Sequence, residues 1–229
     1  MSVANVFAVI SNAVFLIPCA QAIVLRHWTR AVLYFFMSVI SSFYHVCDSW
    51  NGTCVLDAVI HRKMDFFFAQ LLIPVTALYI IKFKGVWCFL ERVIILFVAL
   101  FLFVVEVVSN EPFIIQVIIA GISFFAIITY WIGFAIYTSY KSGGKTWGIP
   151  EYDWDAFVMA VACTALACVL FATQRMWHGG YGWVHSVWHA LAGLGQYWVL
   201  MTRPQKGPVY PVLDKRIYQK IEYTYEEGF

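Results

Sequence analysis

Residues 113–137 read FIIQVIIAGISFFAIITYWIGFAIY, a stretch without a single charged side chain. A transmembrane helix needs about 20 consecutive, mainly apolar residues, so this stretch is long enough to cross a bilayer. The rest of the chain has the same character, because 62% of its 229 residues are hydrophobic and 12% are charged. A soluble domain carries about 25% charged residues. The composition therefore predicts a polytopic membrane protein. The chain has no basic run and a net charge of only +2, and we expect no nucleic-acid partner.

Further apolar segments on both sides of this stretch complete a set of seven. We expect an all-α membrane protein, built as a bundle of seven transmembrane helices. The predicted spans are Val3–Leu25, Ala31–Cys47, Met64–Ile81, Val86–Val108, Phe113–Tyr137, Asp155–Thr173 and Val184–Thr202. The first lacks the basic start of a signal peptide, and the second span follows at once, so we interpret it as a retained helix. We expect residues 1–203 to form the transmembrane domain and residues 204–229 a cytoplasmic tail.

Lysine and arginine are distributed unevenly between the two ends of the predicted bundle. If the N-terminus is outside, twelve of the 15 lie on the cytoplasmic side, and only Arg62, Lys63 and Arg175 lie outside. Without the tail the split is still seven to three. Cytoplasmic loops carry the excess of basic residues. The distribution therefore predicts an extracellular N-terminus and an intracellular C-terminus.

Three histidines fall at the outer end of this predicted bundle. His45 lies near the outer end of the second span, and Ser41 stands one helical turn before it. His185 and His189 begin the seventh span and, being spaced i, i+4, share one helix face. Asp65 lies at the outer start of the third span. Because successive spans run in opposite directions, we expect these side chains to lie at one depth.

Three neutral imidazoles at one depth make a zinc site with an open fourth position. Bound zinc lowers the pKa of its water to about 7 and so produces a nucleophile. In such a site Asp65 would take or orient the water's proton, and Ser41 would hydrogen-bond the water or a ligand carbonyl. We expect His27, His61 and His178 to be packed or solvent-facing. His61 and His178 also lie on the outer side and are therefore the alternative ligands.

Cys47 and Cys54 bracket a short loop that we place outside the cell. That compartment permits disulfides, and we expect a bridge that closes this loop over the histidine end. Two free thiols, or Cys47 as a metal ligand beside His45, are the alternatives.

The chain resembles a superfamily of seven-helix membrane proteins. Ser-x3-His in the second span, Asp in the third and His-x3-His in the seventh resemble the alkaline ceramidases, adiponectin receptors and progestin receptors. This resemblance implies that His45, His185 and His189 hold zinc, with Ser41 and Asp65 beside it. It also implies two alternative functions, a zinc-dependent lipid amide hydrolase and a lipid-binding receptor with structural zinc.

Two stretches are similar to one branch of that superfamily, the myomaker family of muscle-cell fusion proteins. They are FYHVCD at residues 43–48 and WVHSVWH at residues 183–189. This resemblance implies a multi-pass plasma-membrane protein, also found in the Golgi, that promotes myoblast fusion during muscle development. The implied partners are membrane lipids, further copies of the chain and a second fusion protein.

Overall fold

The computed structural model describes residues 3–49, 54, 56–81, 87–108, 112–145, 147–173, 176 and 180–203. No strand occurs among them, and the predicted tail at 204–229 lies outside them. The helices are α1 (Val3–Ser11), the 3-10 turn η1 (Asn12–Phe15), α2 (Leu16–Val24), α3 (Trp28–Ser49), α4 (Ala58–Ile81), α5 (Trp87–Val108), α6 (Pro112–Lys141), α7 (Trp154–Thr173) and α8 (Tyr181–Met201). Each predicted span therefore corresponds to a helix, the first of them interrupted.

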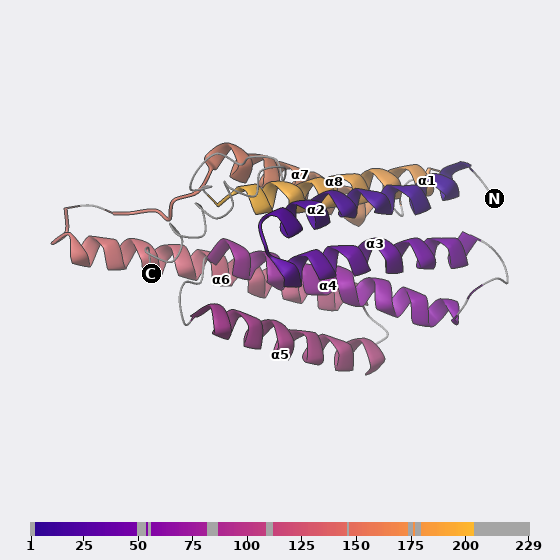
Figure 1. Cartoon of the computed structure of the whole chain (residues 1–229), viewed down its shortest axis with the longest axis horizontal. Coiled ribbons are helices and arrows are strands. Elements are labelled where there is room, and N and C mark those ends of the chain that lie inside the picture. The colour runs from indigo at the N-terminus through magenta and orange to yellow at the C-terminus, as the bar shows by residue number, and fades with distance from the viewer. Residues whose placement is uncertain are drawn as a thin grey trace, which may run out of the picture.

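The helices lie along one common axis (Figure 1). α2 continues the direction of α1, and from α2 onward successive helices run in opposite directions. α4 contacts α3, α5 and α6, while α8 contacts α1, α2 and α7. α1 and α2 also pack on α3 and so join the two groups. Large side chains that are almost fully buried form the core, among them Phe15, Tyr34, Met37, Val75, Tyr79, Leu102 and Leu200.

Several of these helices have the length and composition of membrane spans. Within the described part of the chain, five segments are long and apolar enough to cross a bilayer: Asn5–Val24, Trp28–Asp48, Ala58–Ile81, Ile114–Lys141 and Trp154–Thr173. α5 is otherwise apolar but carries three charged residues, Glu91, Arg92 and Glu106. Large apolar side chains of α5 and α6 remain exposed, including Phe97, Phe101, Phe124 and Phe125. The protein is therefore an all-α membrane protein.

The first predicted span is not one continuous helix, because η1 separates α1 from α2. Pro18 has no N–H to donate to the carbonyl of Val14, and the chain tightens into a 3-10 turn just before it. Asn12 opens this turn and is fully buried. The hydroxyl of Ser38 on α3 donates a hydrogen bond of 2.9 Å to the Asn12 carbonyl. The break is thus anchored by a contact with the neighbouring helix.

α4 begins at Ala58, about two turns before the predicted start at Met64. Asp57 precedes the helix, and its Oδ1 accepts a hydrogen bond of 2.7 Å from a backbone N–H of the first turn, as an N-capping residue does. Lys63 donates from Nζ to the carbonyl of Val107, at 3.1 Å, near the end of α5. The predicted span starts too late because His61, Arg62 and Lys63 interrupt the apolar run.

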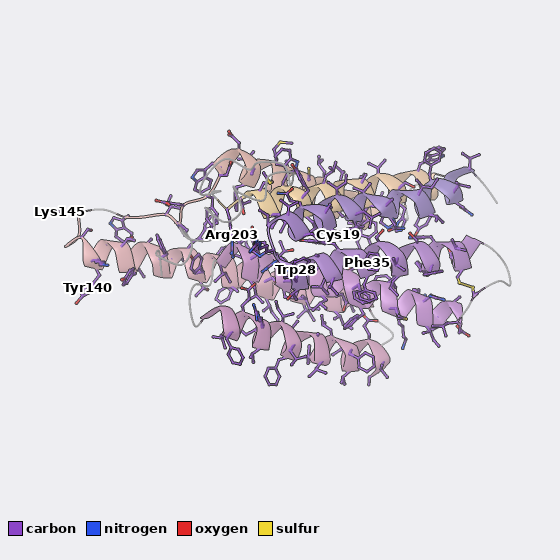
Figure 2. The ribbon with its side chains drawn as sticks, in the orientation of Figure 1. Cys19, Trp28, Phe35, Tyr140, Lys145 and Arg203 are labelled. Carbon is purple, nitrogen blue, oxygen red and sulfur yellow. A yellow bond between two sulfur atoms is a disulfide. The ribbon has the colours of Figure 1, made fainter. Side chains whose placement is uncertain are left out.

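A cluster of basic and aromatic side chains lies at the opposite end of the bundle. Arg30 of α3 forms a buried ion pair with Glu91 of α5. The Arg30 guanidinium carbon lies 4.6 Å from the ring centroid of Tyr79, and that of Arg203 lies 4.0 Å from it. Figure 2 shows Arg203 near Trp28, the first residue of α3. The His27 ring meets Tyr79 edge-on, with 5.3 Å between centroids. This cluster connects α3, α4, α5 and the end of α8.

Candidate metal centre

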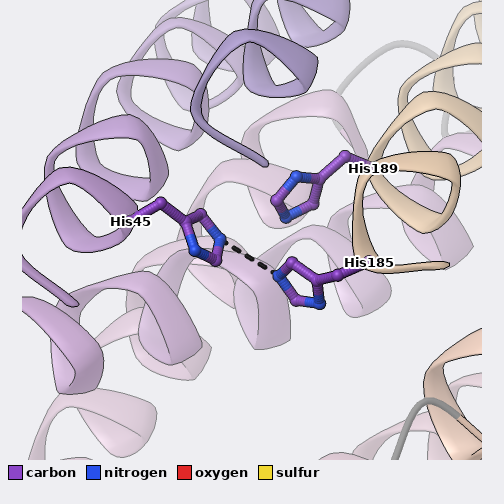
Figure 3. A group of neighbouring side chains, drawn as sticks. All are labelled: His45, His185 and His189. Carbon is purple, nitrogen blue, oxygen red and sulfur yellow. Dashed lines mark hydrogen bonds between the residues drawn. The ribbon is translucent and has the colours of Figure 1, made fainter. Parts of the chain in front are cut away.

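Three imidazoles converge between α3 and α8 (Figure 3). His45 comes from α3, while His185 and His189 come from α8. Nε2 of His45 lies 3.0 Å from Nε2 of His185, and one nitrogen of each ring lies within 4.8 Å of the other two. The three residues are only 4%, 6% and 0% exposed. The structure therefore brings together the three histidines that the sequence placed at one depth.

Local helix geometry explains how these rings meet. The i, i+4 spacing places His185 and His189 on one face of α8, and their ring centroids lie 4.5 Å apart. α1 packs on both α3 and α8, so the N-terminal helix covers the cluster. Phe15 contacts His189 edge-on, with 6.5 Å between ring centroids. The cluster is thus enclosed by the N-terminal segment as well as by its own helices.

The donor set fits a transition-metal ion. Nδ1 of His189 lies 2.9 Å from the hydroxyl oxygen of Ser11, but its buried Nε2 has no hydrogen-bond partner among the described residues. A buried nitrogen without a partner is costly, and a metal ion would satisfy it. Neutral imidazoles are the ligands that Zn²⁺ commonly takes, and three of them leave a position open. The three histidines could therefore hold a metal ion of this kind.

Ser41 and Asp65 lie side by side near this cluster. Both are buried, at 0% and 8% exposure. Ser41 Oγ and Asp65 Oδ1 form no hydrogen bond of good geometry within the described part of the chain. Asp65 lies outside the set of mutually close ligand atoms that the three histidines form. The structure therefore places Asp65 and Ser41 beside the cluster and not within it.

A small cavity of about 50 Å³ adjoins the cluster. Asp65, His185 and Gln116 supply polar atoms to its wall, which is otherwise mostly aromatic: Tyr44, Phe66, Phe171, Tyr181 and Trp188. A cavity of this size holds a few water molecules, since one water needs at least about 10–15 Å³ of such space. Asp65 and His185 therefore line the same cavity.

The other histidines lie apart from this cluster. His61 is 5% exposed and stacks on Phe43, with 6.2 Å between ring centroids. His27 lies at the opposite end, against Tyr79. Both are packed residues, as the sequence predicted. His178 lies outside the described residues.

Cys47 and Cys54 form a disulfide, with 5.2 Å between their Cα atoms. The prediction of this bridge is confirmed, and both alternatives, free thiols and Cys47 as a metal ligand, are excluded. The bridge ties the last turns of α3, which carry His45, to the chain that leads into α4.

Ser11 and Gln116 are site residues that the sequence did not reveal. Ser11 contacts His189 although the two are 178 positions apart, and no periodicity connects positions so distant. The only available signal was a polar pair, Ser11 and Asn12, inside an apolar run. Gln116 gave a similar signal near the start of the 113–137 stretch.

No curated protein matches this chain. Residues 1–190 match a family that is described as "Protein of unknown function (DUF3522)". The match extends from α1 into α8 and contains every residue of the histidine cluster, together with Ser41 and Asp65. It covers well over half of the sequence. The chain therefore belongs to the DUF3522 family.

Proposed function

We propose that this protein promotes cell–cell fusion at the plasma membrane, as the myomaker family does, and that a zinc ion on His45, His185 and His189 supports its structure. One observation carries the proposal. The two stretches that resemble the fusion proteins, residues 43–48 and 183–189, are the same two that supply all three converging imidazoles. The resemblance thus coincides with a buried cluster of three imidazoles.

The proposed topology has seven spans with the N-terminus outside. The arrangement of the helices supports it, because α5 and α8, which complete the seven, lie along the same axis as the five apolar segments (Figure 1). The twelve-to-three charge split supports the orientation. In this topology the histidine cluster lies toward the extracellular face. The exposed apolar side chains of α5 and α6 would contact lipid or another copy of the chain.

A structural role suits the zinc. A metal bound by α3 and α8 would join two helices whose ligands are 140 residues apart, and metal binding stabilises the folded arrangement of its ligands. The adjoining cavity of about 50 Å³ has room for a few water molecules. The Cys47–Cys54 bridge holds the same end of α3. These features favour a rigid site over one that turns over a lipid.

A zinc-dependent lipid amide hydrolase is the second candidate. Its support is the position of Asp65, a buried carboxyl group that shares the cavity with His185 and lies beside Ser41. When bound, zinc supplies a water of lowered pKa as nucleophile. Asp65 would accept the proton from that water at its carboxylate, and Ser41 would donate a hydrogen bond to a substrate carbonyl.

Cell mixing tests the fusion proposal. Non-fusing cells that express the protein are mixed with fusion-competent cells and scored for shared cytoplasm. We expect fusion with the wild type and its loss with His45→Ala or His185→Ala at equal surface expression. His61→Ala is the matched control, because His61 is a buried imidazole outside the cluster. No fusion with the wild type, or unchanged fusion with both cluster variants, would refute the proposal.

A further inference from the structure

Ser11 connects the break in the first helix to the histidine cluster. It is the last residue of α1, directly before η1. Its hydroxyl oxygen lies 2.9 Å from Nδ1 of His189 and also 2.9 Å from the carbonyl oxygen of Ala8. His189 is completely buried, so this contact determines the environment of one side of its ring.

The chemistry of the three groups fixes the direction of both hydrogen bonds. A carbonyl oxygen only accepts, so the Ser11 hydroxyl donates its single proton to Ala8. The lone pairs of Ser11 Oγ then face His189, so Nδ1 carries the proton. The hydrogen bond between the His189 ring and the Ala8 carbonyl likewise requires an N–H on this ring. A neutral imidazole has one protonated nitrogen. Nε2 of His189 therefore presents a lone pair, and this is the nitrogen without a partner among the described residues.

We propose that Ser11 is a positioning residue that selects the Nδ1–H tautomer of His189 and keeps Nε2 ready to bind metal beside His45 and His185. The inference rests on the zinc site proposed above. A second hydrogen bond from the far nitrogen of a metal-binding imidazole fixes both its tautomer and its orientation. The N-terminal helix thereby takes part in the site without supplying a ligand.

The break in the helix is what places this hydroxyl. η1 is held by the buried Asn12, whose Nδ2 donates to the Ala8 carbonyl at 3.0 Å, and by the bond from Ser38 to the Asn12 carbonyl. Two side chains, those of Ser11 and Asn12, thus converge on one carbonyl of α1. The turn that interrupts the first span is therefore also the element that orients His189.

The test compares zinc affinity and histidine tautomer in the purified full-length protein. Ser11→Ala should weaken zinc binding by about 10- to 100-fold in competition with a chelator, as loss of such a supporting bond does. Ser11→Thr retains a hydroxyl and should bind within a few-fold of the wild type. Ser42→Ala is the control, because the Ser42 hydroxyl donates to Val9 of α1 at 3.4 Å without contacting an imidazole.

Nitrogen-15 spectra of the zinc-free wild type provide a readout that does not depend on any variant folding. They should show His189 protonated at Nδ1. Protonation at Nε2 instead, or equal zinc affinity in Ser11→Ala and the wild type, would overturn the role of Ser11 while leaving the zinc site intact. A wild type that binds no zinc at all would refute the zinc site itself, so the two failures are distinguishable.

Discussion

Nε2 of His45 and Nε2 of His185 lie 3.0 Å apart, although 140 residues separate them in the chain. Two neutral imidazoles at this distance either share one proton or direct both lone pairs at a common cation. A third ring, that of His189, lies within 4.8 Å of both through its own ligand atom. A proton shared between two of the rings leaves the lone pair of the third ring without a partner. One metal ion, in contrast, would accept a lone pair from each of the three rings.

The first prediction concerns metal content. Purified protein should contain about one zinc ion per chain, and removal of two imidazoles by His185→Ala with His189→Ala should abolish this zinc. Elemental analysis after removal of loosely bound metal is the measurement. His61→Ala should retain the zinc. Undiminished zinc in the double variant would place the metal elsewhere.

The second prediction concerns the disulfide. Replacing Cys47 and Cys54 by serine should lower the free energy of unfolding by about 2–3 kcal/mol, the loop-closure value for a short loop; the sequence separation is 7. Because the bridge lies two positions from His45, zinc should also dissociate faster. Unfolding in detergent and zinc release to a chelator measure the two effects. Two alkylatable thiols in freshly purified wild type would contradict the bridge.

The third prediction concerns the buried ion pair at the opposite end. Glu91→Ala leaves the Arg30 guanidinium buried without its counter-charge, and such changes destabilise proteins by about 3–5 kcal/mol. The double variant Arg30→Met with Glu91→Leu removes both charges and should be less destabilised than Glu91→Ala. Unfolding titrations in detergent micelles decide between them. If the double variant is less stable than Glu91→Ala, the prediction is wrong, and the ion pair stabilises the fold by more than the neutralisation of two buried charges.

The fourth prediction concerns pH. Burial, with the nearby positive charges of Arg30 and Arg203, lowers the pKa of His27 to about 4, from about 6.5 in an unfolded chain. The unfolded state therefore binds this proton first, so the stability that neutral His27 provides is lost as the pH falls from about 6.5 to about 4. Melting temperatures across this range should fall less steeply in His27→Gln. Equal slopes would contradict the prediction.

The sequence predicted the helices and the histidine cluster for different physical reasons. Apolar runs identified each helix, but the polar residues at 61–63 hid the first turns of α4, and no run showed the break at η1. The cluster followed from two local facts, the i, i+4 spacing of His185 and His189 and the alternation of span direction. These facts set depth along the bundle axis, which is enough to bring His45 to the same level.

Which helices lie side by side in the bundle could not be predicted from the sequence. The contact between Ser11 and His189 depends on which helix lies beside α8, and the cluster of Arg30 and Glu91 depends on α3 lying near α5. Hydropathy and charge indicate how deep a residue lies along the membrane normal. They carry little information about which helices are neighbours in the bundle. Consequently depth was predictable, whereas the hydrogen bonds that orient the imidazoles were not.

The final prediction separates a structural zinc site from a catalytic one. Asp65→Asn preserves the size of the side chain but removes its capacity to accept a proton. If the protein hydrolyses a lipid amide, this change should lower the rate by on the order of 10²-fold or more while zinc remains bound. If zinc is structural, fusion should stay close to the wild-type level, because the amide of asparagine still fits beside Ser41.

Fusion index and zinc content are therefore measured together for Asp65→Asn and Ser41→Ala, at matched surface expression. We expect near-normal fusion with retained zinc in both, since neither residue belongs to the ligand set. Zinc content is the internal control, because a variant that loses zinc reports on folding and not on proton transfer. Abolished fusion with retained zinc, accompanied by fatty-acid release from the wild type alone, would instead assign the protein to the hydrolases. That outcome would make Asp65 the proton acceptor and would require the cavity beside His185 to widen when it admits a lipid.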